Sequence, residues 1–260
     1  ELCAPELQEE HLTEALRSLM PLLLRFVTTT PHPLRERARA VRVVHKLLSV
    51  VVCTDEASVR RLSRGPLNGW TDAIFRMLSS SANGNGNSHD LSDCALELAL
   101  LNLLRLLVST MPRALDAHAE GLIAPIGGLL LRAAKVLEME LQLAGNDGGN
   151  GNGGGFAVAA CDSDGGSLGV SALVSGLLDV FSALASSSRL YKRLLPALPD
   201  VCHAAIGLLR IPPESESEWE SDLSQYLQDE DPDSFAISPR VAAVQMIDEL
   251  LDAYGSKALP

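Results

Sequence analysis

The sequence predicts an all-helical protein, and three observations lead to that prediction. Leu and Ala dominate a chain of 260 residues that is 47% hydrophobic, which is enough to bury a substantial core. Aromatic residues make up only 4% of the chain, whereas the strands of a β-sandwich or barrel favour aromatic and β-branched residues. Apolar residues also recur at helical spacing along most of the sequence.

Two helices are expected in the first part of the chain. Residues 7–27 carry an apolar stripe at helical spacing, which Pro21 is expected to kink or split. Pro33 opens a second helix that runs to about Val52. One face of this helix carries the basic residues Arg35, Arg37, Arg39 and Arg42. This basic stripe is interpreted either as the exposed side of the helix or as a contact for an acidic partner or an acidic loop of the same chain.

The middle and end of the chain continue the helical pattern. Trp70, Ile74 and Leu78 predict a short helix, and Asp90 or Ser92 is expected to cap the next one, which carries Leu96 to Leu107. Further helices are expected over 122–143, 170–186 and 189–210, and from Ser238-Pro239 onward. Residues 144–169 hold ten of the twenty glycines, so this stretch is predicted to be a disordered insertion.

The helices are expected to stack as an α-α superhelix, a solenoid of the HEAT or armadillo type, because helix pairs recur at roughly the 40-residue period of those repeats. A closed helical bundle is the alternative architecture. The predicted division of the chain is helical repeats at 1–143, the insertion at 144–169, a helical repeat at 170–210, an acidic loop at 211–237 and a helix of the next repeat at 238–260.

The acidic loop departs most from the Leu- and Ala-rich background. Between Arg210 and Arg240 there are nine acidic residues and no Lys or Arg, so this connector carries three quarters of the net charge of −12. Trp219 and Tyr226 lie at helical spacing within it and are expected, with Phe235, to anchor the loop on the helices. A solvated linker is the other interpretation of such a charge run.

The same segment resembles the importin-β (karyopherin-β) superfamily, and in particular its importin-9-like branch. The resemblance covers about 35 residues. The residues that carry it are Trp219, Asp222, Tyr226, Leu227, Asp229, Glu230, Asp231, Asp233, Phe235, Arg240, Ala242 and Ala243. The resemblance implies an internal part of a longer nuclear transport receptor built of HEAT repeats. The glycine-rich insertion departs from that branch.

Several partners follow from the resemblance. It implies a receptor that binds RanGTP and basic protein cargo such as histones, contacts Phe-Gly nucleoporins, and shuttles between cytoplasm and nucleus through the nuclear pore. In the family, acidic loops contact Ran or basic cargo, and this role is carried over to Asp229, Glu230, Asp231 and Asp233. Arg240 is expected to pair locally with Asp231, Asp233 or Asp248.

Other function classes are not favoured by the sequence. The negative net charge argues against direct nucleic-acid binding, and no apolar run is long enough for a membrane span. The five cysteines form no CxxC pair, and no catalytic motif is present, so neither a metal, a cofactor nor an enzymatic activity is expected. The alternative function is a HEAT or armadillo scaffold that assembles a complex without Ran-dependent transport.

Overall fold

A computed structural model describes residues 9–29, 32–54, 67–83, 94–146, 168–211, 213–231 and 238–255 of the chain. Every regular element within these residues is a helix, and none of them lies in a strand. The prediction of an all-helical protein is therefore confirmed.

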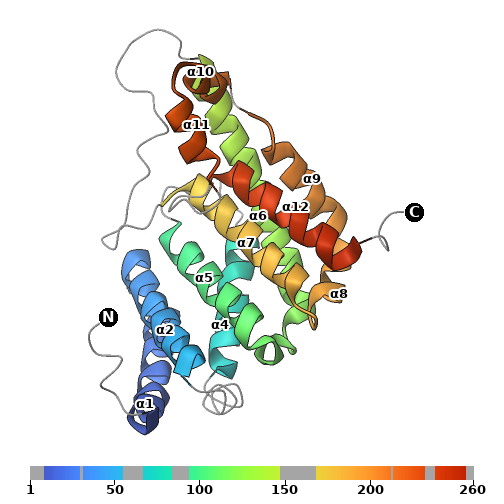
Figure 1. Cartoon of the computed structure of the whole chain (residues 1–260). Coiled ribbons are helices and arrows are strands. Elements are labelled where there is room, and N and C mark those ends of the chain that lie inside the picture. The colour runs from blue at the N-terminus through green and yellow to red at the C-terminus, as the bar shows by residue number, and fades with distance from the viewer. Residues whose placement is uncertain are drawn as a thin grey trace.

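Eight of the described helices lie in two rows (Figure 1). Row A consists of α1 (Glu9–Thr28), α4 (Asn68–Asn83), α6 (Ala119–Asn146) and α9 (Leu198–Leu208). Row B consists of α2 (Leu34–Thr54), α5 (Ala95–Thr110), α7 (Val170–Ser186) and α12 (Pro239–Tyr254). Within each row, every helix packs against the next one along the chain.

The two rows also pack on each other in a regular way. Row A helices α1, α4, α6 and α9 contact their row B neighbours α2, α5, α7 and α12 respectively. Buried side chains from these helices form one continuous apolar core. Each helix therefore has neighbours within its own row and in the other row, which is why the apolar stripes of the sequence are wide.

Helix α7 lies at the centre of this arrangement. It contacts α5 and α12 in its own row and α6 in the other row. The side chains of Val174, Leu177 and Phe181 are wholly buried as a result. Burying a large apolar side chain contributes about 1.5–3 kcal/mol to stability, so the interior of α7 is a major source of the cohesion of the core.

The first helices are fixed by polar contacts as well as apolar ones. The indole Nε1 of Trp70 on α4 donates a hydrogen bond to the carbonyl oxygen of Met20 on α1 at 3.1 Å. Arg37 on α2 donates through Nε to the carbonyl oxygen of Val27 at 2.7 Å, so this member of the predicted basic stripe ties α2 to α1. Pro21 lies inside α1 and does not split it.

The helix predicted over 189–210 is broken into shorter pieces. The structure has α8 (Tyr191–Leu194), a 3-10 turn η3 (Leu195–Ala197) and then α9. Pro196 and Pro199 explain the break, because proline cannot donate the backbone hydrogen bond that a continuous helix needs. A second 3-10 turn, η2 (Pro112–Leu115), follows α5.

The insertion expected at 144–169 lies mostly outside the described residues. At its edges, α6 continues to Asn146, and Leu168 is buried just before α7 begins. The cap predicted at Ser238-Pro239 is present, since the side chain of Ser238 accepts a hydrogen bond from the backbone N–H of Val241 at 3.2 Å.

Candidate partner-binding site

The segment expected to be an acidic loop is largely helical where the structure describes it. It contains α10 (Pro213–Ser221) and α11 (Leu223–Asp229). Asp222 explains why a new helix, α11, begins here. Its side chain caps α11 by accepting a hydrogen bond from the backbone N–H of Ser224 at 2.9 Å. The predicted acidic loop is therefore helical over 213–221 and 223–229, where the sequence had placed Trp219 and Tyr226 at helical spacing.

Two of the three predicted anchor residues are described, and they contact each other. The rings of Trp219 and Tyr226 meet edge to face, with centroids 5.2 Å apart. Trp219 is half-buried, whereas Tyr226 is 39% exposed, and Leu223 and Leu227 are more than half exposed. The apolar side chains of α11 thus do not dock this helix on the two rows. Phe235, the third predicted anchor, lies outside the described residues.

Of the four predicted acidic residues, the structure describes the side chains of Glu230 and Asp231. Glu230 pairs with Arg240 in the first turn of α12, and the Nε of Arg240 lies 3.0 Å from Oε1 of Glu230. Asp231 is exposed, Asp229 ends α11, and Asp233 lies outside the described residues. This pairing with Glu230 was not among those predicted for Arg240, which were Asp231, Asp233 or Asp248, and Asp233 lies outside the described residues. The turn that ends α11 at Glu230 brings that residue to Arg240.

A second acidic region lies on row B, where sequence reasoning did not place one. A groove of about 730 Å³ crosses α5, α7 and α12, which lie side by side in Figure 1. Its volume is large enough for several side chains of a partner. We call it the row-B groove and define it by its charged lining residues, which are Arg105, Asp179, Asp248, Glu249 and Asp252.

The positions of these residues follow from helical spacing. Gln245, Asp248, Glu249 and Asp252 lie on the same side of α12, because residues three and four apart share a helix face. Polar side chains at Asp179, Ser182 and Ser186 form the corresponding stripe on the largely apolar α7. A polar stripe within an apolar helix is thus the signal that could have located the groove from the sequence.

The electrostatics of row B change along the row. Burial raises the pKa of the Asp179 carboxyl, and the nearby Arg105 partly opposes that rise. Burial lowers the pKa of His45 on α2, and the positive charges of Arg105 and Lys46 lower it further. The positive charge of Arg105 on α5 thus acts both on His45 of α2 and on Asp179 of α7.

Hydrogen bonding fixes part of the acidic end. The hydroxyl of Ser186 on α7 donates to Oε2 of Glu249 on α12 at 2.6 Å. This contact joins two helices of row B across the groove. Among the groove carboxylates, Glu249 is the one whose position this hydrogen bond fixes.

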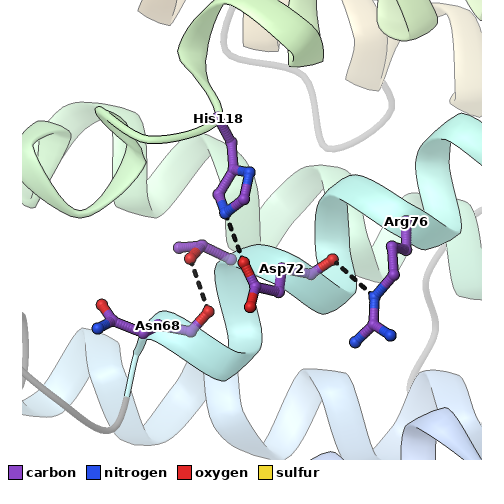
Figure 2. A network of polar contacts seen from close by, with 5 residues as sticks. Asn68, Asp72, Arg76 and His118 are labelled. Atoms are coloured by element: carbon purple, nitrogen blue, oxygen red, sulfur yellow. Dashed lines mark hydrogen bonds and ion pairs between the residues drawn. The ribbon is translucent and has the colours of Figure 1, made fainter.

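Another polar network lies where α4 approaches the start of α6 (Figure 2). The Nε2 of His118, just before α6, lies 2.5 Å from Oδ1 of Asp72 on α4, and the His118 ring stacks on Phe75. Nearby, Arg189 donates through Nε to Oδ1 of Asp116 at 2.7 Å, which lowers the pKa of that carboxyl. These groups are paired between neighbouring helices and turns, so we assign them a structural role.

Some site classes have no counterpart in the described part of the chain. Among those residues, no group of three or more His, Cys, Asp or Glu side chains is placed to hold a metal ion. None of the described helices is long and apolar enough to cross a membrane. No protein-family model matches the chain.

Proposed function

We propose that this chain is a segment of an α-α superhelix of the HEAT or armadillo type, and that it serves as a nuclear transport receptor. The regular contacts support the superhelix, because each row A helix pairs with one row B helix and each pair stacks on the next. The observation that carries the proposed function is the row-B groove, in which four carboxylates from α7 and α12 share one side of the stack.

The charges define the partner that this surface suits. Four carboxylates and one Arg line the groove, and the acidic α10 and α11 precede α12 in the chain. Such a surface attracts proteins rich in Lys and Arg and speeds their encounter. Each exposed ion pair contributes only about 0–1 kcal/mol, so binding requires many pairs at once and weakens with added salt.

The resemblance in residues 219–243 narrows the proposal from a basic-protein binder to a transport receptor. In this proposal the chain binds basic nuclear proteins such as histones, exchanges them for RanGTP, contacts Phe-Gly nucleoporins and moves between cytoplasm and nucleus. It acts by binding alone and uses no cofactor. A scaffold of the same fold, without a role in Ran-dependent transport, is the alternative.

Nucleotide-selective capture of Ran tests the proposed function. The immobilised chain, with its natural flanking sequence, is offered Ran loaded with GTP or with GDP at about 50 and 300 mM salt, conditions between which electrostatic screening differs strongly. The proposal predicts capture of the GTP form alone, weakened at high salt. Equal capture of both forms, or of neither, contradicts a transport role and favours the scaffold.

A variant of the acidic segment tests the contribution of residues 229–233. Asp229, Asp231 and Asp233 are changed together to Asn, and Glu230 is kept because it pairs with Arg240. We expect weaker capture of RanGTP or of core histones, with little change in melting temperature. Unchanged capture at low salt would leave these residues as a linker.

A further inference from the structure

The contacts of Arg240 form a binding place for a guanidinium group. Its Nε lies 3.0 Å from Oε1 of Glu230, and its Nη2 contacts Oε2 of the same carboxylate, so the pair is bidentate. The guanidinium carbon lies 5.6 Å from the centre of the Trp219 ring. A carboxylate fork and an aromatic ring are the two groups that recognise the planar, delocalised cation of arginine.

This binding place is supported by its surroundings. Tyr226 holds the Trp219 ring edge-on, and the two residues come from α11 and α10 respectively. The side chains of Arg240 and Glu230 are 22% and 23% exposed, so the pair is partly shielded from water but remains accessible at its edge. Trp219 and Glu230 belong to the acidic segment that precedes α12, whereas Arg240 belongs to α12 itself.

We propose that Glu230 and Trp219 form an arginine-binding site that Arg240 occupies in the free chain and that an arginine of a partner protein takes over on binding. The inference rests on the proposed function, because it names the group through which a basic partner is recognised. Lysine would fit less well, since its ammonium is a compact, strongly hydrated charge that cannot make the bidentate pair.

Arg240 is then a competitor within the chain. While it holds the site, only the fraction of molecules with the site open binds a partner arginine, and the apparent affinity falls by that fraction. Removing the Arg240 side chain should therefore strengthen binding of arginine-rich segments. Removing any basic residue from an acidic protein also increases its attraction for a basic peptide, so the diagnostic quantity is the preference of the gain for arginine over lysine.

The test compares Arg240→Ala with the unchanged chain. Two fluorescein-labelled peptides serve as probes, one of alternating Arg and Ala and one of alternating Lys and Ala. We expect Arg240→Ala to bind the Arg peptide about tenfold more tightly and the Lys peptide with a clearly smaller gain. Arg113→Ala is the matched control, because it makes the same charge change at an exposed residue of η2.

Three results would overturn the inference. These are no gain for the Arg peptide, an equal gain for both peptides, or the same gain in Arg113→Ala, since the last two reflect net charge alone. Adding Glu230→Gln to Arg240→Ala is expected to remove the gain for the Arg peptide. A gain that survives the loss of the carboxylate also contradicts the assignment.

A chemical-rescue experiment tests the site even if Arg240→Ala destabilises α10 and α11. Hydrogen exchange of α10 and α11 in this variant is measured with added ethylguanidinium and with added ethylammonium. Restored protection with ethylguanidinium alone supports a guanidinium site. If neither cation, or both equally, restores protection, the inference fails.

The two proposals fail separately in these measurements. If the unchanged chain does not capture the GTP form of Ran selectively, the transport role is contradicted. The peptide measurement still tests the arginine-binding site in that case. Selective Ran capture together with no peptide gain in Arg240→Ala contradicts the arginine site alone.

Discussion

The two acidic regions of the molecule differ in how their charges are held. In the row-B groove, carboxylates project from α7 and α12, two long helices that are packed into the core. In α10 and α11 the charges lie on short helices whose main described neighbours are each other, and Glu230 is paired with Arg240. The difference teaches that a dense run of acidic residues in a sequence does not show whether those residues stand on helices that are packed into the core.

Replacing an apolar side chain by Ala should give the largest difference between the two regions, measured as the loss of unfolding free energy. Phe181→Ala on α7 is expected to cost about 3–5 kcal/mol of unfolding free energy, because the side chain is wholly buried and its removal leaves a cavity. Leu227→Ala on α11 removes a side chain that is 62% exposed and is expected to cost less than about 0.5 kcal/mol. Urea unfolding followed by circular dichroism measures both. Similar losses in the two variants would mean that α11 is as firmly packed as α7.

Charge reversal should sharpen the comparison at the level of binding. Asp248→Lys with Asp252→Lys changes two exposed groove residues on α12 and is expected to weaken binding of core histones about tenfold or more, equivalent to at least about 1.4 kcal/mol. Fluorescence anisotropy at low salt measures the affinity.

Two control variants carry the same change of charge. Glu216→Lys with Glu220→Lys alters exposed residues of α10, and Glu138→Lys with Glu140→Lys alters exposed residues of α6 in row A. We expect a smaller loss for α10 and the smallest loss for α6. A loss that is the same at all three places would show that only net charge matters.

The smallest expected effect concerns the cost of burying Asp179. Burial raises its folded-state pKa, so the carboxyl favours the folded state below its ordinary pKa of 3.8, and this contribution is lost as the pH rises through the folded-state pKa. Asp179→Asn should therefore raise the melting temperature slightly at pH 7. The gain should vanish at a pH below 3.8. A gain that does not depend on pH would assign the effect to packing and not to the charge.

Much of the fold followed from apolar spacing alone. The apolar stripe over 170–186 predicted α7 with the bounds that the structure has. Because α7 packs against three neighbouring helices, apolar residues are needed along its whole length. The stretch 189–210 was predicted less well. Its apolar spacing continues through Pro196 and Pro199, but the backbone there cannot form a continuous helix.

The candidate site was harder to predict than the fold. Glu230 was expected to face a partner, yet its carboxylate is used by Arg240, a pairing that depends on where α11 ends. The groove residues Asp179 and Asp248 are far apart in the sequence and carry no motif. They meet only because α7 and α12 pack side by side, which local patterns do not specify.

Hydrogen exchange with and without core histones tests the central claim most directly, namely that row B carries the partner-binding face of the stack. In the free chain, we expect the slowest exchange in α5 and α7 and much faster exchange in α10 and α11. With histones added, protection should rise in α12, α10 and α11, while α6 and α9 of row A stay unchanged. Protection that appears on row A instead, or that spreads evenly over both rows, would contradict the account.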